Sequence, residues 1–141
     1  MAKPRFAVQH FMVCPKVEIQ TAAIENPHTL RDVNYTFEIP AERERPVRLD
    51  DLWVYARFFN GVGKREFSVQ VHWLDARPKA VEVCEFLNIN VMFPVGYSVI
   101  SRAWRFDSIR FPGPGRYLFR LRDGVSRRVL AREFIQLRKL L

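Results

Sequence analysis

Alternating apolar and polar residues recur along most of the chain, and the clearest example lies near its C-terminal end. Tyr117, Phe119 and Leu121 occupy every second position, as the residues on one face of a β-strand do. Asp123-Gly124 follows, a dipeptide typical of hairpin turns, and the run 127–137 is again rich in Val, Leu, Phe and Ile. The pattern predicts a β-hairpin whose inner face belongs to a larger sheet.

Similar apolar runs, separated by Pro, Gly and Asn, predict most of the remaining chain as short strands. The predicted strands cover 5–13, 17–21, 33–39, 52–59, 67–73, 80–87 and 97–106, and residues 109–111 either extend the last of these or form a short strand of their own. Together with the C-terminal hairpin this gives about eight or nine strands, at a spacing typical of sandwiches and barrels. No helical periodicity longer than about two turns and no internal repeat is present. The prediction is an all-β protein: a single antiparallel β-sandwich domain over residues 1–141.

Two of these strands are predicted to pair as neighbours. The strand 52–59 is apolar on both faces, which indicates a central position in its sheet. Asn60-Gly61 follows it and predicts a hairpin with the strand 67–73. Residues 41–48 are highly charged and contain Pro46, so they are predicted as an exposed connection. Residues 88–96 are predicted as a loop, and His28 is placed in another loop beside Asn26-Pro27.

Composition fits this assignment and limits the alternatives. Apolar residues make up 48% and aromatic residues 13% of the chain, enough for a packed interior. No run of about 18 apolar residues exists, so no membrane span is predicted. Gln9 and His10 interrupt the first apolar run, which we interpret as a strand rather than a signal peptide, so a cytoplasmic location is expected. In that compartment Cys14 and Cys84 are expected to be free, buried thiols.

The formal net charge of +8 lies entirely in the last part of the chain. Residues 1–100 hold twelve basic and twelve acidic residues, whereas residues 101–141 hold eleven basic and three acidic ones. Such an asymmetry can mark an electrostatic binding surface.

The C-terminal hairpin concentrates this charge on one face. If Tyr117, Phe119 and Leu121 point inward, every other residue of that strand points outward. On the return strand the inward set is predicted to be Val129, Ala131, Ile135 and Leu137, with Glu133 interrupting the alternation and indicating a bulge. The outward set defines what we call the arginine face: Arg116, Leu118, Arg120, Arg122, Arg128, Leu130, Arg132 and Phe134.

Two interpretations of the arginine face remain open from the sequence. Arginine stems can simply shelter apolar residues on a solvated sheet. Arginine mixed with aromatic and aliphatic residues is also the composition of protein interfaces. Arginine binds both carboxylates and phosphates in a bidentate manner, so a nucleic acid is the alternative partner. A phosphate-binding face would be expected to hold more Lys and more exposed aromatic residues, which favours protein.

The segment Gly115-Arg116-Tyr117-Leu118-Phe119-Arg120-Leu121 resembles the Gly-x-Tyr-x-hydrophobic-x-hydrophobic strand of immunoglobulin-like sandwiches. The resemblance implies a tyrosine corner at Tyr117 and a closing hairpin after it. Phe119 stands where that family has its second cysteine, so no inter-sheet disulfide of the antibody kind is implied. The chain also resembles small uncharacterised bacterial β-sandwich proteins of unknown function, which share a proline-glycine break, this Tyr strand and a closing hairpin. Sandwich folds host unrelated functions, so the resemblance implies architecture and no activity.

No local motif points to catalysis. The sequence contains no His-Glu-x-x-His, Cys-x-x-Cys or Gly-x-Ser-x-Gly, and its histidines, His10, His28 and His72, are far apart. We therefore expect no cofactor, no metal and no enzymatic activity. The predicted role is an interaction or structural module that docks another protein, or a second copy, through the arginine face. The alternatives are nucleic-acid binding through the same arginines, and a small hydrolase or metal enzyme with a site assembled from distant residues.

Overall fold

The computed structural model describes residues 5–14, 16–19, 28–31, 36–39, 47–49, 52–106 and 108–139. Within these ranges the chain forms strands, turns and loops, and no helix. The strands are β1 (Ala7–Cys14), β2 (Lys16–Ile19), β3 (His28–Arg31), β4 (Thr36–Ile39), β5 (Val47–Arg48), β6 (Trp53–Phe59), β7 (Gly63–Trp73), β8 (Val81–Phe93), β9 (Val99–Arg105), β10 (Arg110–Phe111), β11 (Gly115–Asp123) and β12 (Val129–Lys139).

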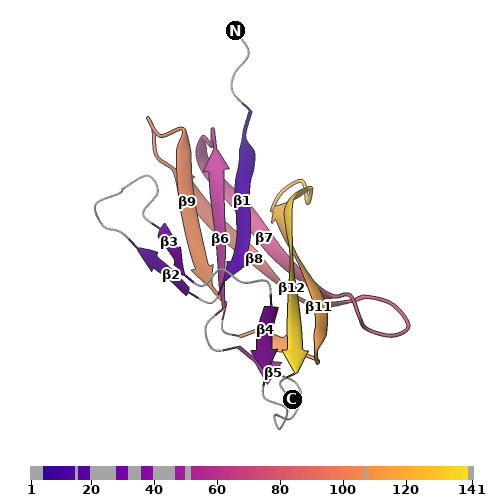
Figure 1. Cartoon of the computed structure of the whole chain (residues 1–141). Coiled ribbons are helices and arrows are strands. Elements are labelled where there is room, and N and C mark those ends of the chain that lie inside the picture. The colour runs from indigo at the N-terminus through magenta and orange to yellow at the C-terminus, as the bar shows by residue number, and fades with distance from the viewer. Residues whose placement is uncertain are drawn as a thin grey trace.

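Two larger sheets account for eight of these strands (Figure 1). One has the order β1-β6-β9 and the other the order β4-β12-β11-β7-β8. Every pairing within them is antiparallel except that of β12 with β4, which is parallel. The remaining strands form two small pairs, β2 with β3 and β5 with β10.

The core lies between the two larger sheets and is built from alternate residues of their strands. Phe58 of β6 stacks on Phe67 of β7 with ring centroids 5.0 Å apart, and Phe93 packs edge-on against Phe58 at 5.6 Å. Toward the other end, Tyr117 meets Phe111 edge-on at 4.9 Å. Alternation explains this arrangement, because successive side chains of a strand point to opposite faces and only one face meets the opposing sheet.

The hydroxyl of Tyr117 ties β11 to the segment that precedes it. It donates a hydrogen bond to the carbonyl oxygen of Gly113 at 2.5 Å and lies 3.3 Å from the Gly113 amide, from which it accepts. This is the tyrosine corner that the sequence predicted. With two facing sheets, this feature makes the fold an all-β sandwich of the immunoglobulin-like type, which confirms the predicted fold class. Cys14 and Cys84 are both free; Cys14 is buried and Cys84 half-buried.

The predicted hairpin between the strands 52–59 and 67–73 is wrong. β6 pairs with β1 and β9, as the predicted central position requires, whereas β7 pairs with β8 and β11 in the other sheet. Asn60 does adopt the left-handed conformation (φ 58°) that the Asn-Gly signal suggested. However, the connection carries the chain across the sandwich, because both edges of β6 are already occupied.

Three other assignments also differ from the sequence prediction. β8 continues through residues 88–93, which were predicted as loop; Asn88 has a φ of 59° at a register shift, so the strand passes through a bulge. His28 begins β3, and residues 47–48 form β5, although both were predicted as connections. The predictions for residues 20–27, 32–35 and 41–46 lie outside the described ranges.

Candidate interaction face

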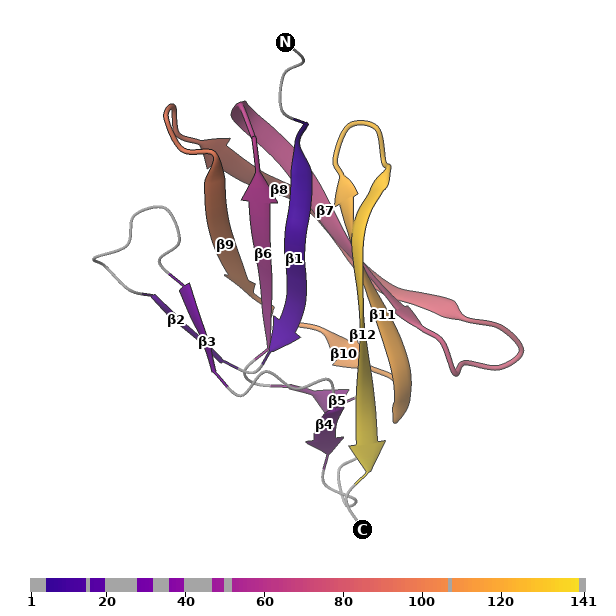
Figure 2. The same ribbon diagram turned by 45° about the horizontal axis from the view of Figure 1, so that its top comes forward.

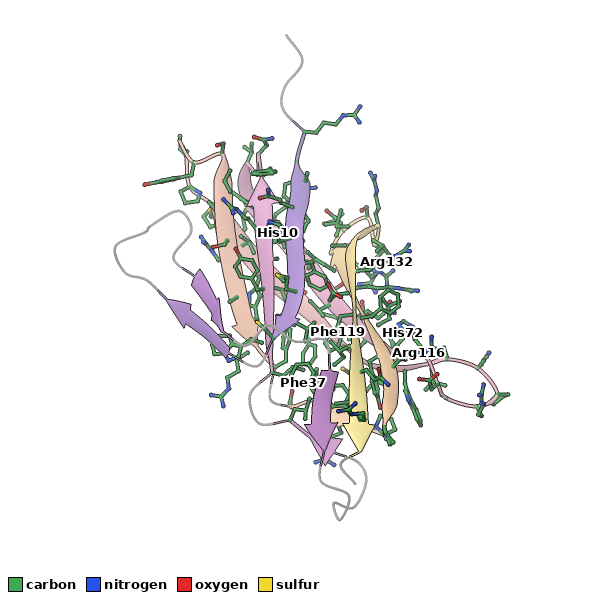
Figure 3. The ribbon with its side chains drawn as sticks, in the orientation of Figure 1. His10, Phe37, His72, Arg116, Phe119 and Arg132 are labelled. Carbon is green, nitrogen blue, oxygen red and sulfur yellow. The ribbon has the colours of Figure 1, made fainter. Side chains whose placement is uncertain are left out.

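The outer face of the five-stranded sheet carries most of the predicted arginine face. On β11, Tyr117, Phe119 and Leu121 are fully buried, so the alternate residues Arg116, Leu118, Arg120 and Arg122 point outward. On β12 their partners are Gln136, Phe134, Arg132 and Val129, in that order. Figure 3 shows Arg116, Arg132 and His72 on this outer side, with Phe119 turned toward the opposing sheet.

The prediction was wrong for Leu130 and partly wrong for Arg128. A bulge in β12 places Leu130 as the extra residue between Ala131 and Val129, and Leu130 packs against the core cluster. Val129, predicted to face inward, instead stands opposite Arg122. Arg128 is exposed, but it precedes β12 and lies in the turn rather than on the strand face.

The predicted bulge at Glu133 does not occur. Glu133 stays in register opposite Phe119, on the inward side, and its carboxylate accepts a hydrogen bond from the Phe134 amide at 2.9 Å. Burial raises the pKa of Glu133 above its ordinary value, while this hydrogen bond acts in the opposite direction.

Two carboxylates from outside the β11–β12 hairpin, Asp75 in the turn after β7 and Glu85 of β8, neutralise part of the arginine face. Arg116 pairs with Asp75, with Nη2 3.0 Å from Oδ1, and the Arg116 amide donates to the same carboxylate at 2.6 Å. These hydrogen bonds lower the pKa of Asp75. Arg122 and Arg127 both meet Glu85 of β8. The sequence argument considered only β11 and β12, and therefore missed these partners.

Arg120 and Arg132 differ from their neighbours because no carboxylate in the described part of the chain pairs with either. They stand directly opposite each other on β11 and β12. The Nε atom of Arg120 is buried and has no hydrogen-bond partner there. Like charges at directly opposed positions destabilise a sheet, and a buried donor without a partner adds to this cost. The pair is therefore a position where an external anion would be favourable.

Apolar surface lies immediately beside this arginine pair. Phe134 is 52% exposed, and its cross-strand neighbour Leu118 is only 5% exposed although it lies on the outer face. His72 of β7 stands opposite Leu118. Burial, and then the positive charge of Arg120, lower the pKa of His72, which keeps the imidazole neutral at pH 7. The result is an apolar strip bordered by two guanidinium groups.

Metal or thiol chemistry has little support in the part of the chain that the structure describes. No group of three or more His, Cys, Asp or Glu residues within those ranges comes together as a metal site. Cys84 sits on the inner side of β8, opposite Val71, and burial raises the pKa of its thiol to about 11. A thiol with that pKa is almost entirely protonated at neutral pH, so it is a poor nucleophile.

No protein-family model and no curated protein sequence matches the chain. Its fold is similar to part of the alkylpurine DNA glycosylase AlkC of Pseudomonas fluorescens, solved bound to DNA containing an abasic site analog: the TM-score is 0.54 and the identity 12%, over 97% of this chain and 31% of the glycosylase. The chain thus spans about a third of that protein's length. An immunoglobulin-like protein from Pseudomonas aeruginosa matches with a TM-score of 0.47 and 12% identity, over 98% of this chain and all of the other. At these identities the likeness concerns the fold alone.

Proposed function

We propose that this protein is a non-enzymatic interaction module that docks an acidic surface of another protein, or of a second copy, through the outer face of β11 and β12. The observation that carries the proposal is the pair Arg120 and Arg132, which lacks any carboxylate partner among the described residues and lies beside the half-exposed Phe134. We also propose that it belongs with the small bacterial β-sandwich proteins that its last hairpin resembles.

The chemistry of the face defines the partner it would fit. A carboxylate placed between the two guanidinium groups would accept charge-assisted hydrogen bonds from both, and so offset their mutual repulsion. An apolar side chain beside that carboxylate would cover Phe134 and exclude water from the ion pairs. Arg116 and Arg122 would contribute less to binding this partner, because Arg116 already pairs with Asp75 and Arg122 with Glu85.

Nucleic-acid binding through the same arginines is the second candidate. Guanidinium groups without a carboxylate partner bind phosphates as readily as carboxylates. The glycosylase with a similar fold was solved on DNA, which adds a reason to test this candidate directly. It predicts that affinity falls steeply as salt concentration rises, since phosphate binding releases counterions.

Capture from a lysate of the source cells at low and high salt, with and without nuclease, separates the two candidates. A protein that remains bound after nuclease treatment and is lost with the charge-reversed variant R120E/R132E supports the proposal. The matched control is R77E/R110E, which makes the same charge change at two exposed arginines elsewhere. Capture that requires nucleic acid and disappears with salt would favour the second candidate. Capture that R120E/R132E leaves intact would refute both.

A second variant separates charge from apolar contact. F134A removes the exposed ring and leaves both guanidinium groups in place. The partner protein should bind F134A at least about tenfold more weakly than the wild type. An aromatic side chain near the centre of an interface commonly contributes more than about 1.4 kcal/mol to the free energy of binding. V81N, a substitution at another exposed apolar residue, should have no such effect.

A further inference from the structure

One end of the sandwich gathers three connections between strands. Residues 60–62 join β6 to β7, residues 94–98 join β8 to β9, and residues 124–128 join β11 to β12. Figures 1 and 2 show all three at the end where β1 begins. We call this region the loop end and define it as Arg5 together with residues 60–64, 92–98 and 124–128.

Each of these connections presents an exposed valine. Val62 is 87%, Val95 101% and Val125 83% exposed, and Met92 beside them is 58% exposed. Turns usually carry Gly, Asn, Asp, Ser or Pro at such positions. Single exposed apolar residues are ordinary, but four of the seven large ones in the described part of the chain lie at this one end. The loop end is therefore an apolar tip rather than a set of unrelated surface residues.

Hydrogen bonds fix the connections that carry these valines. The Asn60 amide donates to the carbonyl oxygen of Ser98 at 2.7 Å, which joins the first two connections. The Asn60 side chain donates to the carbonyl oxygen of Arg5 at 3.0 Å, and the Gly124 amide donates to that of Glu66 at 2.8 Å. Between the first two connections lies a hollow of about 450 Å³ whose lining includes Val62, Phe93, Pro94 and Tyr97. Preorganisation of this kind reduces the entropy lost on binding.

The charge at the loop end has one sign. Its residues include Arg5, Lys64, Arg127 and Arg128, and no Asp or Glu. Arg127 pairs with Glu85, which leaves three basic residues without a carboxylate partner in the described part of the chain. Asp123 and Glu66 lie just outside the region, with the Glu66 side chain against Gly124. The Asp123 carboxylate already accepts hydrogen bonds from the Val125 and Ser126 amides and from Arg65.

We propose that the loop end binds the surface of an anionic lipid bilayer. Val62, Val95 and Val125 would enter the boundary between headgroups and acyl chains, and Arg5, Lys64 and Arg128 would lie at the level of the lipid phosphates. Apolar side chains at a tip, surrounded by basic ones, match the stacked apolar and anionic layers of such a membrane. The contact is peripheral. No helix in the described ranges is long and apolar enough to cross a membrane.

Co-sedimentation with vesicles tests this assignment. The protein should bind vesicles of phosphatidylcholine mixed with phosphatidylserine, and bind phosphatidylcholine alone much more weakly. The variant V62N/V95N/V125N should reduce the partition coefficient at least about tenfold, because it removes the apolar area that enters the bilayer. V81N/L87N is the matched control, since both of those residues are exposed on β8 outside the loop end, and it should change partitioning less than about twofold.

A second pair of variants tests the charge. K64E/R128E should weaken binding to the anionic vesicles more than R77E/R110E, which makes the same change in net charge elsewhere. Three results would each overturn the proposal. The wild type could bind neutral and anionic vesicles equally, it could fail to bind anionic vesicles, or the triple valine variant could bind like the wild type. Dimerisation in sedimentation velocity that the triple variant abolishes, without vesicle binding by the wild type, would identify a second copy as the occupant and also overturn it.

Discussion

Replacing Tyr117 by Phe removes a single oxygen atom from the centre of the fold. The side chain of Tyr117 is fully buried, and its hydroxyl serves both the amide and the carbonyl oxygen of Gly113, itself a buried residue. Phe fills nearly the same volume, so no large cavity forms. The Gly113 amide and carbonyl would, however, be left buried without this partner, and each such loss is costly.

The expected cost is about 2 kcal/mol, within a range of about 1–3 kcal/mol for an unsatisfied buried group. For 141 residues the entropy of unfolding is roughly 0.3 kcal/mol per degree. The midpoint of thermal unfolding should therefore fall by about 7 °C. Urea unfolding should show the same loss as a lower midpoint with an unchanged slope, because the surface exposed on unfolding is the same.

Y97F is the matched control for Y117F. Tyr97 is half-buried in the connection between β8 and β9, and its hydroxyl has no hydrogen-bond partner in the described part of the chain. Its removal should change stability by less than about 0.5 kcal/mol. If Y117F and Y97F shift the midpoint equally, the hydroxyl of Tyr117 does not stabilise the corner and the reasoning is refuted.

Three further expectations concern ionisable groups. The R120Q variant should raise the pKa of His72, because the charge of Arg120 is one cause of the lowered pKa. An NMR titration that follows His72, with His10 as internal reference, measures this change. An unchanged pKa of His72 would contradict the placement of the two side chains. The ordinary pKa of Glu133 is 4.5 and its folded-state pKa is higher, so stability falls as the pH rises above the ordinary value. In urea titrations, E133Q should therefore gain stability relative to the wild type as the pH is raised above 4.5. An equal response of both proteins to pH would refute the shift. The pKa of the Cys84 thiol is about 11, against the usual 9.0. At about pH 8, Cys84 should therefore react with a thiolate-specific reagent roughly 100-fold more slowly in the native protein than in denaturant. Equal rates in the two states would show that the thiol is not buried.

Alternation and turn chemistry predicted most of the strands and the pairing of β11 with β12, but not the partners of β6 and β7. Asn60-Gly61 has the composition of a hairpin turn, and the backbone at Asn60 follows it. Whether the next strand folds back beside β6 or crosses to the other sheet depends on β1 and β9, which occupy both edges of β6. That information lies about 40 residues away on either side, beyond the reach of a local pattern.

Only the outline of the arginine face was predicted, again because a local pattern does not show which distant residues lie beside it. Parity counted along β11 placed its outward residues correctly, whereas the bulge at Leu130 reversed the parity of the first residues of β12. The carboxylates that neutralise Arg116 and Arg122 come from residues 75 and 85, which alternation on β11 and β12 does not include. The sequence predicted a basic face, but it did not single out Arg120 and Arg132.

The parallel pairing of β4 with the end of β12 bears on the order in which the fold is assembled. β12 meets β11 through a short turn, and such a hairpin closes within microseconds. The pairing of Gln136 with Thr36 joins residues about one hundred positions apart, and the entropy of closing that loop must be overcome before any of its hydrogen bonds form. We expect the hairpin to form early and β4 to dock late, so substitutions in β4 should change the unfolding rate much more than the folding rate.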